Sequence, residues 1–104
     1  LGVVVGNLLE NALEAAREAG PDRRRVEFRM WEEDGAVQIL VRDWGKGIPA
    51  ALQERVFEQG FSTKGMGRGI GLYLVKKHVE TAGGRIFLDS REGEGTAVLV
   101  CIPQ

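Results

Sequence analysis

A loop of alternating glycines is the segment of this sequence whose residue types point most directly to chemistry. It runs Lys64-Gly65-Met66-Gly67-Arg68-Gly69-Ile70-Gly71 and leads into an apolar-periodic segment that starts near Leu72. Glycine adopts positive φ angles and lets backbone amides approach a ligand closely, and the start of the following helix would offer free N–H groups. With the charges of Lys64 and Arg68, the segment suits a polyphosphate. A merely flexible tether is the alternative interpretation.

Two common phosphate-binding patterns do not fit this loop. The P-loop requires G-x-x-x-x-G-K-[ST], and no window of the sequence satisfies it. The dinucleotide pattern G-x-G-x-x-G also fails, because the glycines alternate at every second position and no strand leads directly into them. A nucleotide site here would therefore be of another kind.

Two asparagines, Asn7 and Asn11, lie one turn apart on one face of the first predicted helix, and Glu10, Glu14 and Glu18 project the same way. Asparagine is a poor helix former, so propensity does not explain its place in mid-helix. Paired amide oxygens beside carboxylates could face a hard cation such as Mg²⁺. The alternative is the solvent side of an amphipathic helix, and this segment alone leaves both interpretations open.

A carboxylate stands at the end of a predicted strand, in Asp43-Trp44-Gly45-Lys46-Gly47. In a pocket, such a carboxylate can accept a hydrogen bond from an exocyclic amine. By itself, the segment favours the simpler interpretation of an Asp/Gly strand exit.

Hydrophobic periodicity outlines the elements that would position these residues. The first helix carries an apolar face of Leu1, Val5, Leu8, Leu9, Ala12, Leu13 and Ala16. The strands are expected as two hairpins, the first turning at Asp34-Gly35. We therefore predict an α+β two-layer sandwich, with helices on one face of an antiparallel or mixed sheet. The expected helices are Leu1–Ala19, Ala50–Phe57 and Leu72–Ala82, and the expected strands are Val26–Glu32, Val37–Asp43, Arg85–Ser90 and Thr96–Ile102.

Length and composition predict one domain, residues 1–104, with ordinary globular chemistry. There are 15 glycines and 1 cysteine, and 14 basic against 15 acidic residues give a net charge of −1. No global field therefore draws the chain to nucleic acid or a membrane. Cys101 has no partner for an internal disulfide and is expected as a buried strand thiol. Because the chain begins inside a helical pattern without an initiator Met, we expect a piece of a longer protein.

Five short motifs occur along the chain in a characteristic order. They are Asn7-Leu8-Leu9-Glu10-Asn11-Ala12, Asp43-Trp44-Gly45-Lys46-Gly47, Phe57-Glu58-Gln59-Gly60-Phe61, Gly65-Met66-Gly67-Arg68-Gly69-Ile70-Gly71-Leu72 and Gly93-Glu94-Gly95-Thr96. In order and spacing, the chain resembles the catalytic, ATP-binding domain of sensor histidine kinases, within the class that includes gyrase, the mismatch-repair ATPases and a heat-shock chaperone. Any one motif is weak evidence, whereas five in order are very specific.

The resemblance extends to a subgroup and to a fold. The run Gly60-Phe61-Ser62-Thr63-Lys64, followed closely by residues 68–76, is most similar to kinases related to the citrate and dicarboxylate sensors. The family implies a two-layer α/β sandwich of the Bergerat type, with a mixed, mostly antiparallel sheet and a mobile ATP lid.

The resemblance also implies roles for the motif residues. Asn11 would coordinate the Mg²⁺ that bridges the phosphates of ATP, with Asn7 lining the same site. Asp43 would accept a hydrogen bond from the adenine amino group, and Thr96 would support that end, partly through water. The catalytic residues implied are Asn7, Lys64 and Arg68. The other cofactor-binding residues implied are Gly45, Gly47 and Ile48 in the pocket wall, and Thr63, Lys64, Gly65, Met66, Gly67, Arg68, Gly69, Ile70, Gly71 and Leu72 in and beside the lid.

The reaction implied is transfer of the γ-phosphate of ATP, leaving ADP, to a histidine on a separate dimerising helical domain. Such a site needs Mg²⁺, backbone amides and a cation more than a nucleophile. His78 lies within a predicted helix and is expected to be structural or solvent-facing, not the acceptor. The family implies a homodimeric parent, a response regulator downstream and a cytoplasmic domain without membrane contact. Whether the parent is anchored in the inner membrane stays open.

Three other functions remain as alternatives. Relatives that hydrolyse ATP carry a glutamate general base where this chain has Asn7, and an amide cannot take a proton from water at neutral pH. A hydrolysing ATPase therefore ranks second to the kinase. The lid sequence argues against a serine kinase of the anti-sigma type, and the intact motifs argue against a degenerate domain used for protein contact. The sequence departs from many kinases at Glu14 and Ala15, where a basic residue and an aromatic are usual.

Overall fold

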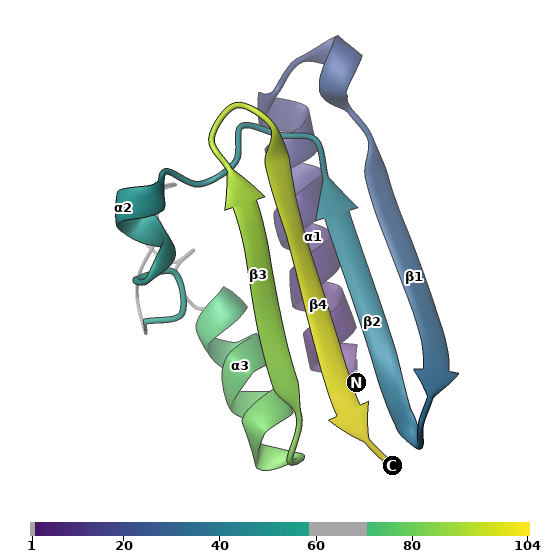
Figure 1. Ribbon diagram of the computed structural model, residues 1–104. Helices are drawn as coiled ribbons and strands as arrows, with labels where there is room; N and C mark the ends of the chain where they lie inside the picture. Colours follow the sequence, from purple (N-terminus) through teal and green to yellow (C-terminus); the bar gives the residue numbers. More distant parts are fainter. Residues whose placement is uncertain (1, 59–70) are drawn as a thin grey trace.

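A four-stranded sheet carries two long helices on one side (Figure 1). The computed structural model describes residues 2–58 and 71–104. Within these ranges the strands are β1 (Val26–Glu33), β2 (Ala36–Asp43), β3 (Arg85–Arg91) and β4 (Gly95–Pro103). Their order in the sheet is β1-β2-β4-β3, and each neighbouring pair is antiparallel. The predicted two-layer sandwich is confirmed.

Two hairpins build the sheet, and backbone conformation explains the tightness of their turns. Asp34 and Gly35 join β1 to β2 with φ angles of 53° and 76°, the positive pair that a two-residue turn requires. Gly93, with φ of 84°, lies in the turn between β3 and β4. The β2–β4 ladder then joins the hairpins, so the ends of all four strands are set relative to one another.

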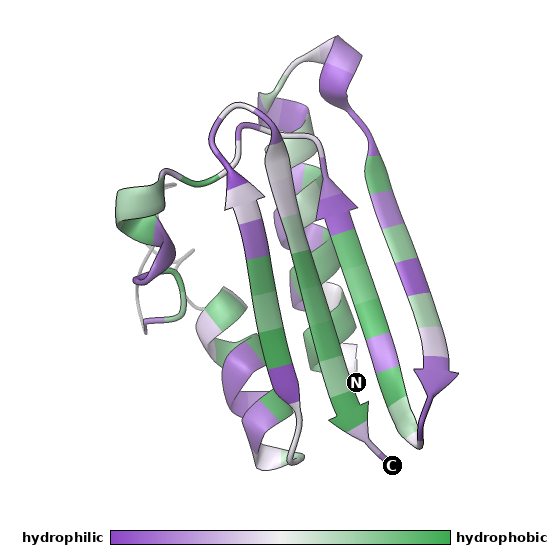
Figure 2. Ribbon diagram, viewed as in Figure 1, coloured by the Kyte–Doolittle hydropathy of each residue, from purple (hydrophilic) through white to green (hydrophobic). Residues whose placement is uncertain are grey.

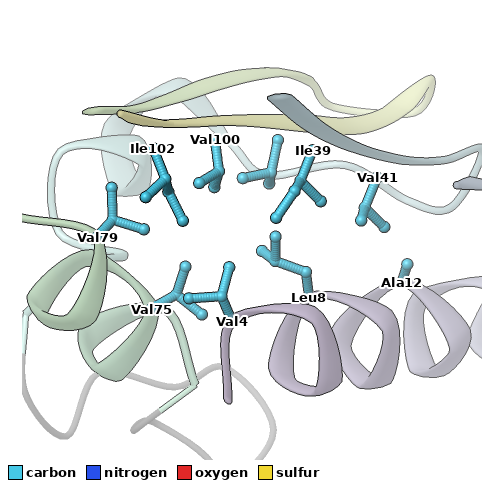
Figure 3. Packing of buried hydrophobic residues seen from close by; sticks show 10 residues of the cluster. Val4, Leu8, Ala12, Ile39, Val41, Val75, Val79, Val100 and Ile102 are labelled. Carbon is cyan, nitrogen blue, oxygen red and sulfur yellow. The ribbon is translucent and has the colours of Figure 1, made fainter. Parts of the chain in front are cut away.

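The helices α1 (Gly2–Glu18) and α3 (Gly71–Thr81) cover the same face of the sheet. Figure 3 shows the resulting core, with side chains from both helices meeting inward-facing strand residues. Removing these groups from water supplies the main stabilisation of the domain. The core residues are Val4, Leu8, Ala12, Ile39, Val41, Val75, Val79, Val98, Val100 and Ile102.

The prediction that Leu13 belongs to the core-facing side of α1 is wrong. Leu13 is 48% exposed, whereas Leu8 and Ala12 are buried. Each residue turns about 100° around a helix, so Leu13 lies beyond the stripe that faces the sheet. Val5 and Leu9 do pack against the core as expected, and the mixed hydropathy around α1 is visible in Figure 2.

Two smaller expectations also need correction. The helix α2 spans Ala50–Gln53 and does not reach Phe57. Arg55 and Glu58 instead donate backbone hydrogen bonds to Leu52 and Arg55, three residues back, which makes a succession of tight turns. Cys101 is a free thiol but only half-buried, because β4 turns it to the face of the sheet opposite the helices, where Gln38 Nε2 lies 3.3 Å from its sulfur.

None of the helices described reaches the length and apolar character needed to cross a membrane. His78 is exposed near the end of α3, as the sequence predicts.

Candidate functional site

A row of three polar residues crosses the sheet on its helix-covered side. Asp43 ends β2, Thr96 lies directly opposite it on β4, and Ser90 lies opposite Thr96 on β3. The next inward-facing row of the same strands is apolar, with Val41 opposite Val98. Asp43 and Ser90 are only 6% and 7% exposed. Buried polar side chains in an otherwise apolar layer need hydrogen-bond partners, and this row is the candidate recognition site of the sheet.

The carboxylate of Asp43 holds the turn that follows its strand. The backbone N–H of Gly45 donates to Asp43 Oδ1 across 2.9 Å. This is the Asp/Gly strand exit that the segment alone favours. A carboxylate offers about four acceptor positions, so one backbone hydrogen bond is compatible with a second role in binding an amine.

The glycines around Asp43 are required by close backbone approach. A Cβ atom on Gly45 would lie 2.8 Å from the carbonyl oxygen of Ala15 on α1. Gly47 has φ of 71°, and a Cβ there would meet the carbonyl of Arg91; Gly95 has φ of 125°, and a Cβ there would meet the carbonyl of Asp43. Glycine at these positions therefore allows α1, the strand exit and the β3–β4 hairpin to converge.

Two residues that the sequence analysis missed fix the predicted pocket wall at Ile48. The N–H of Ile48 donates to Ser90 Oγ across 2.9 Å. Gln53 Nε2 donates both to the Ile48 carbonyl, at 2.9 Å, and to the Ser90 carbonyl, at 2.8 Å. The available signal was Ser90 itself, because a serine at an inward-facing position of an apolar strand needs hydrogen-bond partners.

The predicted metal ligands lie together on α1, and one of them touches the start of α3. Asn7 and Asn11 are both half-buried. Asn7 Nδ2 donates to the carbonyl of Val3 across 2.8 Å, which leaves its amide oxygen to face elsewhere. A Cβ atom on Gly71 would lie 3.1 Å from Asn11 Nδ2 and 3.3 Å from its Oδ1. The structure therefore brings Asn11 next to the first residue of α3.

One helix connects the two halves of the candidate site. Ala15 contacts Gly45 beside Asp43, and Asn11 lies one turn earlier, about 6 Å along the α1 axis. Asn11 in turn contacts Gly71. α1 thus contacts both the strand exit beside Asp43 and the beginning of α3.

These residues fit Mg²⁺ by their chemistry. Amide oxygens are hard ligands, and Mg²⁺ commonly takes one or two protein oxygens while water and phosphate fill its other positions. Across residues 2–58 and 71–104, no cluster of three or more His, Cys, Asp or Glu side chains forms a different metal site.

Charged and aromatic groups surround the strand exit at the surface. Lys46 Nζ lies 3.4 Å from Glu18 Oε2, an exposed pair that contributes little to stability. The guanidinium carbons of Arg25 and Arg42 lie 4.4 Å and 4.8 Å from the ring centre of Trp44. These cation–π contacts hold Trp44 beside the sheet edge.

The lid residues of the prediction lie outside the described residues. They are Thr63, Lys64, Gly65, Met66, Gly67, Arg68, Gly69 and Ile70. At the borders of this segment, Leu72 packs against the core, and Lys76 Nζ lies 5.1 Å from the ring centre of Phe57.

Comparison with known proteins identifies the arrangement. Residues 1–104 match the sequence profile of the family described as "Histidine kinase-, DNA gyrase B-, and HSP90-like ATPase". The chain belongs to this family. As an ATPase domain of this family, it is similar to the sensor protein CitS of Halalkalibacterium halodurans, with 42% identity over 100% of this chain and 20% of the relative. A probable C4-dicarboxylate sensor kinase of the same organism is 39% identical over the same shares of the two chains.

The fold of this ATPase domain also matches solved structures. A mycobacterial sensor histidine kinase, MprB, superposes with a TM-score of 0.78 and 34% identity, covering 98% of this chain and 68% of that one. These similarities confirm the predicted family and subgroup resemblance. The chain spans about a fifth of the length of the curated relatives it matches.

Proposed function

We propose that this ATPase domain binds Mg-ATP and donates the γ-phosphate to a histidine on a separate phosphoacceptor domain. The observation that carries the proposal is the path of α1, which contacts the strand exit of Asp43 through Ala15 and the start of α3 through Asn11. One helix would thereby link base recognition, metal binding and phosphate binding. The similarity to a probable C4-dicarboxylate sensor kinase and to the sensor histidine kinase MprB supports the kinase reaction over other uses of the fold.

The polar row of the sheet would recognise the adenine base. Asp43 would accept a hydrogen bond from the amino group of adenine, and Thr96, directly opposite, would support the same group. Gly45, Gly47 and Ile48 would line the pocket, held by Asp43, Ser90 and Gln53. Because these hydrogen bonds are made within the protein, the pocket would be formed before the nucleotide arrives.

The phosphate end would be organised by α1 and α3. Asn11 and Asn7 would hold Mg²⁺, which supplies charge neutralisation to the phosphates when bound. The start of α3 at Gly71 would direct backbone N–H groups toward the phosphates. Lys64 and Arg68 would add positive charge, and the alternating glycines around them would cover the phosphates as a lid.

An amide at position 7 favours transfer to a protein over hydrolysis. Asn7 cannot accept a proton from water at neutral pH, and its Nδ2 is engaged by the carbonyl of Val3. Attack by water would therefore lack the base that a hydrolysing ATPase uses. A histidine acceptor brings its own nucleophilic nitrogen and needs chiefly to be positioned.

The wider assignment follows the resemblance to sensor histidine kinases. We propose that the phosphoacceptor histidine lies on a helical domain of the parent protein, that the parent acts as a homodimer, and that a response regulator receives the phosphate. The domain would work in the cytoplasm.

The test is a labelling experiment with purified components. The chain is mixed with γ-labelled ATP, Mg²⁺ and the helical domain of its parent, and the protein bands are assayed for acid-labile, base-stable label. Label on the helical domain, lost when its histidine is replaced, is the expected result. Release of free phosphate without protein label would instead assign the chain as a hydrolysing ATPase.

A further inference from the structure

The hydroxyl of Ser90 makes three polar contacts at the end of the sheet. The Ile48 N–H lies 2.9 Å from Ser90 Oγ, the carbonyl oxygen of Gly95 lies 3.2 Å from it, and Thr96 Oγ1 lies 2.8 Å from it. Ser90 is 7% exposed, so water competes little for these contacts. Ser90 belongs to none of the five motifs in the sequence.

A count of protons gives one arrangement that satisfies every contact in this group. A serine hydroxyl has one proton to donate and two lone pairs that accept. The Gly95 carbonyl can only accept, and the Ile48 N–H can only donate. All three contacts are therefore hydrogen bonds at once in one arrangement, in which Ser90 donates to Gly95 and accepts from both Ile48 and Thr96.

This arrangement leaves Thr96 as a pure acceptor toward its other neighbours. Its single hydroxyl proton is used by Ser90, and Oγ1 retains lone pairs. On the next strand, Asp43 lies directly opposite Thr96, at the separation of a cross-strand pair, about 5 Å between Cβ atoms. An ionised carboxylate also only accepts. A ligand group, or an intervening water, that brings protons matches two acceptors side by side better than a third acceptor does.

We propose that Ser90 is a specificity-determining positioning residue: by holding the Thr96 proton, it makes the base pocket select an amino group over a carbonyl at the ring position facing Asp43. The inference rests on the proposed binding of ATP. A 6-amino purine supplies protons to the acceptor pair, whereas a 6-oxo purine places a third acceptor there and leaves the pair unmatched. A site built for a donor rejects the analogue that lacks it, because the carbonyl oxygen would face two acceptor oxygens and supply no proton to either.

The test compares ATP with inosine triphosphate, which carries a carbonyl in place of the 6-amino group, and with inorganic triphosphate. Calorimetry on the wild-type chain with Mg²⁺ should show ATP binding tighter than inosine triphosphate by about tenfold or more. In Ser90→Ala, the Thr96 hydroxyl is released and can donate to a carbonyl, so the ratio should fall below the wild-type value, while Asp43 still favours the amino group. Ser90→Ala also removes the hydrogen bond from the Ile48 N–H. That loss should weaken the binding of both nucleotides equally, so it should not change the ratio of their affinities.

Two further variants separate this role from a structural one. Ser90→Thr keeps the hydroxyl and should keep the wild-type ratio. Thr96→Val removes the hydroxyl on which Ser90 acts, so adding Ser90→Ala to Thr96→Val should leave the ratio where Thr96→Val alone sets it. A further fall in the double variant would show that Ser90 acts by another route and would overturn the inference.

The outcomes distinguish this inference from the proposed function. If the wild-type chain binds ATP tightly and Ser90→Ala keeps the wild-type ratio of ATP affinity to inosine triphosphate affinity, the role of Ser90 is wrong and the kinase assignment stands. If the wild-type chain binds no Mg-ATP, the proposed function fails, and the inference fails with it.

Discussion

The side-chain amide of Asn11 lies directly against Gly71, so closely that a Cβ atom there would come within 3.1 Å of Asn11 Nδ2. Asn11 belongs to α1 and Gly71 begins α3, so the contact joins the predicted metal ligand to the predicted phosphate-binding helix. A larger side chain at position 71 would therefore displace the side-chain amide of Asn11.

We expect Gly71→Ala to weaken Mg²⁺-dependent ATP binding by about tenfold without destabilising the fold. The added methyl would displace the end of the Asn11 side chain, while alanine itself favours a helix over glycine by about 1 kcal/mol. Calorimetry and thermal unfolding measure the two effects. Gly6→Ala on α1 is the matched control, since a Cβ at Gly6 meets nothing within 4 Å; equal affinity loss in both variants would contradict the steric argument.

Replacing Asn11 by alanine should abolish the part of the ATP affinity that depends on Mg²⁺. The amide oxygen is a hard ligand, and alanine offers none. Because Asn11 is only half-buried, the melting temperature should change little. Titrations with Mg²⁺ and with EDTA measure the metal-dependent part. Glu10→Ala, an exposed change on the same helix, is the control, and an Asn11→Ala variant with unchanged metal dependence would remove Asn11 from the metal site.

In the base pocket, Asp43→Asn should weaken ATP far more than inorganic triphosphate. The amide oxygen can still accept from the Gly45 N–H, so the turn is kept. The loss of the carboxylate removes a charge-assisted hydrogen bond to the base, worth about 1.5–3 kcal/mol, or about tenfold to a hundredfold in affinity. Competition binding with both ligands tests this. Equal weakening of the two would show that Asp43 serves only the strand exit.

Within one turn of α1, the effect of a substitution on the free energy of unfolding should depend on how buried the residue is. Val4 is 2% exposed and Val3 is 43% exposed, so the same change at adjacent positions compares a core site with a surface site. Val4→Ala should cost about 2 kcal/mol in the free energy of unfolding, through lost transfer energy and an incompletely filled cavity. Val3→Ala should cost less than about 0.5 kcal/mol. Urea denaturation measures both, and similar costs would contradict the assignment of the buried face.

The sequence predicted the elements well where local rules decide them. Positive φ angles at Asp34 and Gly35 make the turn of the first hairpin, and the strand boundaries agree within a residue or two. It failed where tertiary packing decides. Leu13 has the apolar character of the core stripe but lies beyond the sheet, and the segment after Gln53 tightens into turns because its amides bond three residues back.

The candidate site was only partly visible in the sequence. Asp43, Thr96 and Asn11 could be named from their motifs. The structure places Asp43 and Thr96 at one end of the sheet, and Asn11 one turn along α1 from the residue that contacts Gly45. The hydrogen bonds of Ser90 and Gln53 link residues 42 and 37 positions apart, respectively. No spacing rule identifies such partners, because the pairing arises only when the two hairpins meet.

The sheet order has a kinetic consequence for the site. The hairpins β1–β2 and β3–β4 each close over a short turn, whereas β2 and β4 meet only after the chain has brought residues far apart in sequence together. Closing that long loop carries the larger entropic cost. Asp43 and Thr96 belong to this late ladder, so a half-folded chain with both hairpins formed has no base pocket. Nucleotide would then bind only the completed sheet, and each binding event would draw the folding equilibrium toward the native state.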